Sequence, residues 1–280
     1  MSFSKYDVKP TALLGELIGT FVLAVIAVTI GQPLIVGFTL VVLVLALNVI
    51  SGANLNPAIS FGLWSVKKMN GVKMLMYWLM QFVGAYMALL LVQMYNGGGY
   101  TLSLASFGKL DLKIALAELV AVAIFAFAVA AASQRKLADA AASLCIGLGL
   151  MVGLYAGAGL ISQAAQAPTL ATQKTASRVS LVEGVAANPA IALALTEKDQ
   201  QSQASQFGLT GQQAQKTQPA SRLTLETIVG CLLGGAIGMN LYFAAAGENP
   251  FEKKGVKASV ARVFKKGKKQ VKKTTKKAKK

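Results

Sequence analysis

The sequence contains no histidine and only two cysteines among its 280 residues. Without histidine, a pH gate or a general base built on an imidazole is excluded. Cys145 and Cys231 both lie inside long apolar segments, where we expect them to act as small packing residues. The sequence therefore predicts neither a disulfide framework nor a metal site.

Charged residues are also scarce, at 14%, whereas hydrophobic residues make up 54% of the chain. Most acidic residues are scattered singly in polar segments, so the paired carboxylates needed for acid–base catalysis are not evident. No spacing of a nucleophile with a base is evident either. We therefore expect no enzymatic activity, no catalytic residue and no cofactor.

What the sequence has instead is apolar segments near twenty residues long, which is the length that spans a bilayer as a helix. Six such blocks are expected, at about 11–30, 34–50, 74–95, from near 117 onward, 142–161 and 223–246. This pattern predicts an all-α membrane protein with six transmembrane helices.

Two short copies of Asn-Pro-Ala stand out between these blocks, at Asn56-Pro57-Ala58 and Asn188-Pro189-Ala190. Asparagine is a preferred helix N-cap, and proline is favoured at the first helical position. Each copy is followed by an apolar run too short to cross a membrane. The two motifs therefore predict two half-helices.

The order of three spans and one half-helix occurs twice, so the second copy starts from the opposite side of the membrane. We expect an inverted repeat in a channel domain at residues 11–246, with repeat one at 11–95 and repeat two at 112–246. Residues 1–10 precede this domain, and a basic tail at 247–280 follows it.

The distribution of basic residues predicts the orientation. Half of the 28 basic residues follow Phe251. Cytoplasmic segments of membrane proteins are enriched in lysine and arginine, so we expect both termini of this multi-pass protein in the cytoplasm. The tail is expected to contact anionic lipid, with nucleic-acid binding as a minority alternative.

Two half-helices entering from opposite faces meet near the midplane with their N-termini, each of which carries roughly half a positive charge. Such a passage repels cations, including protons, and accepts neutral hydrogen-bonding molecules. The carboxamide oxygens of Asn56 and Asn188 would cap their helices, which leaves each NH2 to donate into the lumen. The predicted central barrier is Asn56, Pro57, Ala58, Asn188, Pro189 and Ala190.

An acidic residue lies near the start of the first apolar block of each repeat, at Glu16 and Glu118. An ionisable group inside a membrane segment is a functional candidate by default. Irregular backbone at the half-helix loops needs acceptors that lipid cannot supply. We therefore expect both carboxylates to support the half-helices by accepting backbone N–H groups.

These residues, together with Ser51-Gly52-Ala53 before the first motif, resemble the major intrinsic protein family of aquaporins and aquaglyceroporins over about Leu13–Ala246. The resemblance implies six tilted helices and two half-helices around one pore per protomer, commonly in a homotetramer. It also implies passage of water and, in some members, of glycerol, urea or other small neutral solutes.

The family pattern assigns an outer constriction to Val36, Leu154, Val185 and Ile191, all of them apolar. Most members carry arginine where this chain has Ile191, and often histidine where it has Asn54. An apolar constriction favours a broader range of small neutral solutes. Alternatively, Arg178 or Arg222 folds back from the long outer insertions over the mouth of the pore.

The resulting hypothesis is a passive channel for water and small uncharged solutes that excludes ions and protons. The alternative is a membrane anchor or scaffold whose pore conducts poorly and whose basic tail binds anionic lipid or nucleic acid. A coupled secondary transporter built on the same inverted repeat is a third possibility, and it would need an ion site.

Overall fold

The computed structural model describes residues 8–97, 110–166, 178–197 and 220–248. These residues are helical apart from their connections and contain no strand. Six of the helices are long and apolar enough to cross a membrane. The elements are α1 (Pro10–Thr29), α2 (Pro33–Ser51), α3 (Pro57–Ser65), α4 (Gly71–Tyr95), α5 (Leu112–Gln134), α6 (Asp139–Gln166), the 3-10 helix η2 (Arg178–Leu181), α7 (Pro189–Ala194) and α9 (Leu225–Ala245).

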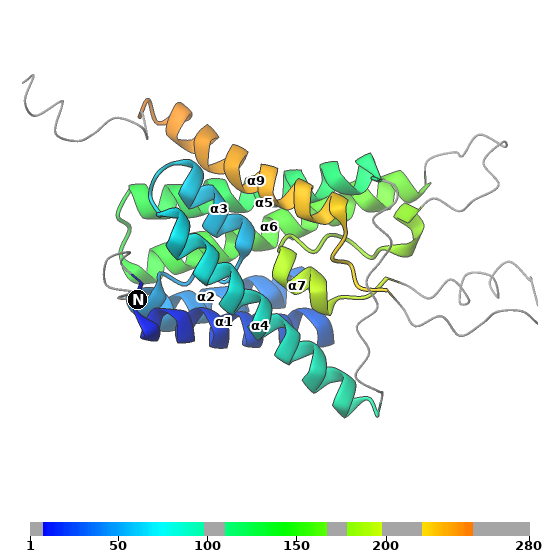
Figure 1. Ribbon diagram of the computed structural model, residues 1–280. Coiled ribbons are helices and arrows are strands. Elements are labelled where there is room, and N and C mark those ends of the chain that lie inside the picture. Colours follow the sequence, from blue (N-terminus) through cyan, green and yellow to red (C-terminus); the bar gives the residue numbers. More distant parts are fainter. Residues whose placement is uncertain (1–7, 98–109, 167–177, 198–219, 249–280) are drawn as a thin grey trace, which may run out of the picture.

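The contacts between helices repeat from one half of the chain to the other. Helix α1 packs against α2 and α4, just as α5 packs against α6 and α9. The short helix α3 packs against α9, and the short helix α7 packs against α4. The short helix of each half therefore contacts a long helix of the other half. Helices α1 and α5 run in opposite directions (Figure 1). The predicted inverted repeat is therefore confirmed.

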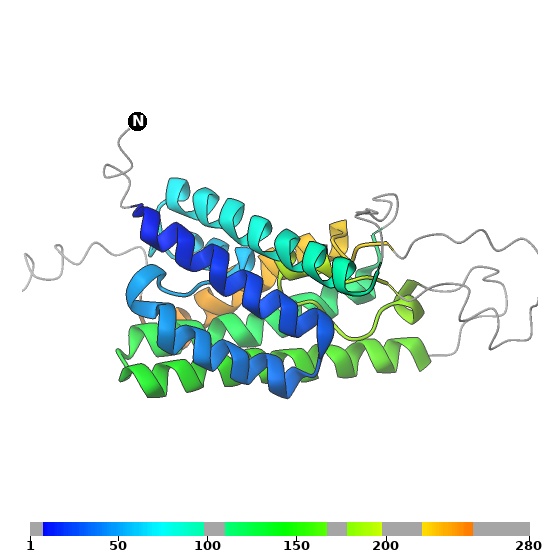
Figure 2. The same ribbon diagram turned by 90° about the horizontal axis from the view of Figure 1, so that it is seen from below.

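The short helices α3 and α7 pack against the long helices and enter the bundle from opposite ends (Figure 1). Seen after a quarter turn, α1 and α4 lie side by side, and α5 and α6 cover the opposite side of the bundle (Figure 2). The starts of α1, α4 and α6 and the end of α9 share one end of the bundle (Figure 1). We call the opposite end, which holds η2, the η2 end.

Several long helices extend beyond the apolar blocks because polar residues cap them. The Asn70 side chain accepts a hydrogen bond of 2.8 Å from a backbone N–H in the first turn of α4. Asp111 caps α5 in the same way at 2.9 Å. Counting apolar residues misses such caps, since the first turn of a helix can be polar. The predicted tail at 247–280 lies outside the described residues from 249 onward, and so do most of the outer insertions.

Glycines let the helices approach until one backbone touches another. A Cβ added to Gly238 in α9 would lie 2.2 Å from the Ala123 carbonyl oxygen in α5. A Cβ on Gly153 in α6 would lie 2.3 Å from the carbonyl oxygen of Ala121. Backbone cannot yield as a flexible side chain can, so these positions admit only glycine at the present helix spacing.

We predict that Gly238→Ala lowers the thermal unfolding temperature of the purified protein in detergent. Its methyl group would force α9 away from α5, and overpacking of this kind costs about 1–3 kcal/mol. Gly159→Ala in α6 is the matched control, because a Cβ there meets no atom within 4 Å. Equal unfolding temperatures for the two variants would contradict the close-packing explanation.

Candidate functional site

The two Asn-Pro-Ala motifs begin α3 and α7 inside the bundle. The Asn56 Oδ1 accepts a hydrogen bond of 2.9 Å from the backbone N–H of Ala58. The Asn188 Oδ1 accepts one of 3.0 Å from the N–H of Ala190. Pro57 and Pro189 occupy the first helical positions, where a missing N–H costs nothing. Both short helices are therefore capped as their sequences predict.

The same two asparagines also join the loops that precede the short helices. The Asn56 Nδ2 donates to the Ala187 carbonyl oxygen at 2.8 Å. The Asn188 Nδ2 donates to the Leu55 carbonyl oxygen at the same distance, 2.8 Å. Each side-chain amide has two N–H groups, so at most one of each remains to donate to a permeant. The sequence led us to expect that the whole NH2 group of each asparagine would donate into the lumen, whereas one of its two N–H groups is bonded to the opposite loop.

The residues whose carbonyl groups accept these hydrogen bonds have a left-handed backbone conformation. Leu55 and Ala187, which immediately precede the two asparagines, have φ angles of 51° and 50°. Residues with a Cβ adopt this conformation at a cost of about 1–2 kcal/mol, so other contacts must hold them there. The matching pair of strained residues marks the two loops as equivalent parts of the repeat.

Two buried carboxylates provide those contacts. Glu16 accepts hydrogen bonds from the backbone N–H groups of Asn54 at 3.0 Å and Leu55 at 2.8 Å. Glu118 accepts from the N–H groups of Ala186 at 2.8 Å and Ala187 at 2.7 Å. Both glutamates are 0% exposed. Each carboxylate therefore satisfies two backbone donors of a loop that has no helical partners of its own.

The surroundings of the two carboxylates differ. The Gln81 Nε2 donates to Glu16 at 2.8 Å and to the Ser60 Oγ at 3.2 Å. The Cys231 Sγ lies 3.4 Å from Glu118, and Arg222 forms an ion pair with it at 3.6 Å. From the sequence, Gln81 was assigned no role, Cys231 was expected only to pack, and Arg222 was considered only for the mouth of the pore. Gln81 could have been noticed as a buried amide inside an apolar span.

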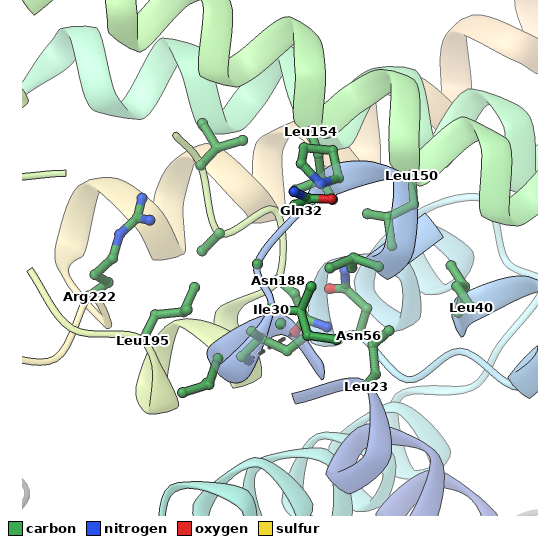
Figure 3. A pocket seen from close by; sticks show the side chains of 18 of the residues that line it. Leu23, Ile30, Gln32, Leu40, Asn56, Leu150, Leu154, Asn188, Leu195 and Arg222 are labelled. Carbon is green, nitrogen blue, oxygen red and sulfur yellow. Dashed lines mark hydrogen bonds between the residues drawn. The ribbon is translucent and has the colours of Figure 1, made fainter. Parts of the chain in front are cut away.

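A cavity of about 570 Å³ runs between the helices, and both motif asparagines line it. In Figure 3 Arg222 lies toward one end of the cavity and Leu40 toward the other, with Asn56 and Asn188 between them. The predicted site residues that line the cavity are Val36, Asn56, Leu154, Val185, Asn188 and Ile191.

The remaining predicted residues lie behind this lining. Pro57, Ala58, Pro189 and Ala190 are buried in the first turns of α3 and α7. Glu16 and Glu118 lie behind the two loops, in contact with their N–H groups. The apolar residues of the predicted constriction come from four elements: Val36 from α2, Leu154 from α6, Val185 from the loop before α7, and Ile191 from α7.

Polar groups at the η2 end also line the cavity, and most of them were missed from the sequence. They are Gln32, Glu183, Thr196, Glu197 and Arg222. They come from separate connections between helices, which only the tertiary fold brings together. Of the two arginines considered from the sequence, Arg222 lines the cavity, whereas Arg178 pairs with Glu197 and Glu226.

The charge of Arg222 is maintained by its neighbours. Burial lowers the pKa of its guanidinium, and the carboxylates of Glu118 and Glu197 oppose this shift. Arginine ordinarily loses its proton only far above neutral pH, so the side chain stays cationic at physiological pH.

Residues 11–159 match the sequence profile of the family described as Major intrinsic protein. The chain belongs to the major intrinsic protein family. Aquaporin Z of Photorhabdus laumondii subsp. laumondii is 29% identical over 168 residues, which cover 50% of this chain and 73% of that protein. Aquaporin AqpM of Methanothermobacter marburgensis is 45% identical over 49 residues, covering 18% of this chain and 20% of the archaeal protein.

The fold also resembles that of a solved structure. The structure of the aquaglyceroporin from Plasmodium falciparum superposes with a TM-score of 0.50 over 83% of this chain and 94% of that one, at 19% identity. Members of the major intrinsic protein family are membrane channels and typically tetramers. This chain is therefore an integral multi-pass membrane protein and a channel for water or small solutes, not an enzyme.

We predict that Glu16→Leu destabilises the protein more than Glu16→Gln. Leucine removes both acceptors and leaves the N–H groups of Asn54 and Leu55 without a partner, at about 1–3 kcal/mol for each buried donor. Glutamine keeps one acceptor oxygen, so it should retain part of the stability. Thermal unfolding in detergent measures the order, and a leucine variant as stable as the glutamine variant would contradict this role of Glu16.

Proposed function

We propose that this channel conducts water and small uncharged solutes such as glycerol and urea, and that it excludes ions and protons. The observation that carries the proposal is the cavity, because one continuous space is lined by both motif asparagines and by the four apolar residues. The outer constriction is then Val36, Leu154, Val185 and Ile191, and the central barrier is the pair of Asn-Pro-Ala motifs.

The apolar residues support the range of solutes. Val36 and Ile191 offer water no hydrogen bond in place of those it leaves behind, so passage at this level depends on the diameter. A solute with C–H groups, such as glycerol, contacts these side chains through its carbon atoms and so loses less hydrogen-bonding free energy there than water does. The side-chain N–H groups of Asn56 and Asn188 can then donate to any neutral molecule that accepts a hydrogen bond.

The two short helices support the exclusion of cations. Their N-termini face the same passage, and aligned peptide dipoles place partial positive charge there. Helix α3 has nine residues and α7 has six, so α3 supplies the larger share. A proton or metal ion would have to pass both ends without its full hydration shell, whereas a neutral solute would not be repelled.

We further propose that both termini face the cytoplasm and that four copies assemble. At the end of the bundle opposite η2, the described basic residues are Lys9, Lys67, Lys68, Lys73, Arg135 and Lys136. The described basic residues at the η2 end are only Lys113, Arg178 and Arg222. This asymmetry favours a cytoplasmic position for the first end. The tail, which lies outside the described residues, would then be held near anionic lipid by its lysines.

The first test is the permeability of the wild-type protein in liposomes. We expect stopped-flow light scattering to report faster water, glycerol and urea equilibration than in empty liposomes. Water passage without either solute would refute the broad solute range. If none of the three exceeds the empty control, the channel conducts poorly, and the anchor or scaffold alternative is favoured.

The second test is Ile191→Arg, with Ile191→Leu as a control of similar size and polarity. Ile191 lines the cavity at 3% exposure, so a longer, charged side chain at this position should narrow the passage. We expect urea and glycerol permeability to fall about tenfold, with water permeability largely retained. Unchanged solute permeability in the arginine variant would show that the constriction lies elsewhere.

A further inference from the structure

Backbone hydrogen bonds hold the segment around Arg222 against α7, the half-helix that begins with the second motif. Its backbone N–H donates to the Leu195 carbonyl oxygen, at the end of α7, at 2.8 Å. The neighbouring Ser221 Oγ contacts the Ala192 and Leu193 carbonyl oxygens at 3.1 and 3.0 Å. The segment before α9 is therefore fixed to α7, and the Arg222 side chain enters the cavity at a defined position.

The guanidinium is oriented by the loop that leads to Asn188. Its Nη1 donates to the Glu183 carbonyl oxygen at 3.1 Å, and its Nη2 donates to the Gly184 carbonyl oxygen at 2.8 Å. The side chain is 5% exposed. Its Nε is buried and has no hydrogen-bond partner among the described residues. A buried donor without a partner is costly, so this N–H group favours a hydrogen-bond acceptor that can come close to it.

The positive charge faces the cavity, and its counter-charge lies behind it. Arg222 lines the cavity, whereas its ion-pair partner Glu118 does not and is 0% exposed. The Glu118 oxygens also accept two backbone N–H groups, so the carboxylate is held away from the lumen. Glu197, which does line the cavity, is paired with Arg178. Glu183 also lines the cavity but is exposed, so among the described residues the only buried charged side chain in the lining is that of Arg222.

We propose that Arg222, supplied by the segment before α9, is the charge filter at the η2 end of the pore, where it repels small cations and donates a hydrogen bond to neutral solutes. This rests on the proposed passage of small neutral solutes. The apolar residues Val36 and Ile191 then set the diameter, and Arg222 sets the charge that can enter. Its position depends on contacts with Glu118 and with backbone carbonyl groups.

Urea and guanidinium test this directly, because they have the same planar shape and nearly the same size but differ in charge. Uptake of each radiolabelled compound into proteoliposomes is compared for the wild type, Arg222→Gln and Arg222→Lys. We expect the wild type to pass urea and exclude guanidinium. In Arg222→Gln guanidinium uptake should rise about tenfold with urea uptake maintained, since the repelling charge is gone. Arg222→Lys keeps the charge and should exclude guanidinium.

Lys113→Gln is the matched control, because this exposed lysine at the η2 end does not line the cavity, and it should behave as the wild type. Exclusion of guanidinium by Arg222→Gln while it still passes urea would overturn the proposal. So would equal guanidinium entry through Arg222→Lys and Arg222→Gln. Failure of the wild type to pass urea or water would instead refute the proposed function, so the two failures are distinguishable.

Loss of Arg222 leaves Glu118 without its ion-pair partner, so Arg222→Gln could fail to fold. Water permeability reports folding in each variant. If Arg222→Gln conducts no water, the double variant Glu118→Gln with Arg222→Gln removes both charges of the pair together. It should admit guanidinium, whereas Glu118→Gln alone should exclude it. Exclusion by the water-conducting double variant would also overturn the proposal.

Discussion

The hydrogen bonds from Glu16 and Glu118 to the two loops before the short helices hold the centre of this structure together. Each loop places backbone N–H groups deep inside the bundle, where water and lipid cannot satisfy them. One carboxylate accepts from two successive N–H groups in each loop. With these donors satisfied, Leu55 and Ala187 can remain left-handed and present their carbonyl groups to the asparagines.

Helix packing follows from the same centre. The short helices occupy the interior, so the long helices must surround them and still touch one another. Glycines such as Gly235 in α9 allow this, because a Cβ there would lie 2.2 Å from the Ala58 carbonyl oxygen in α3. Close contact of backbones provides the packing that the hydrophobic effect cannot provide between helices in lipid. The cavity is what remains between the long helices and the two loops.

The symmetry of the repeat is broken where the two carboxylates meet their further partners. Glu16 is surrounded by neutral groups, including the amide of Gln81, whereas Glu118 faces the guanidinium of Arg222. Among the described residues that line the cavity, Arg222 at the η2 end is therefore the only cation. In the function that we propose, the duplicated framework forms the central barrier and a single unduplicated side chain discriminates between solutes at one end.

The sequence by itself determined the six spans, the two short helices and their inverted arrangement. Span length and the Asn-Pro-Ala caps are local properties, because bilayer thickness and helix capping act on consecutive residues. Only the tertiary structure decided that Asn56 and Asn188 each donate to the other's loop, and that Arg222 rather than Arg178 lines the cavity. These contacts join residues from distant segments, and no local pattern specifies which of two polar side chains a folded loop will turn inward.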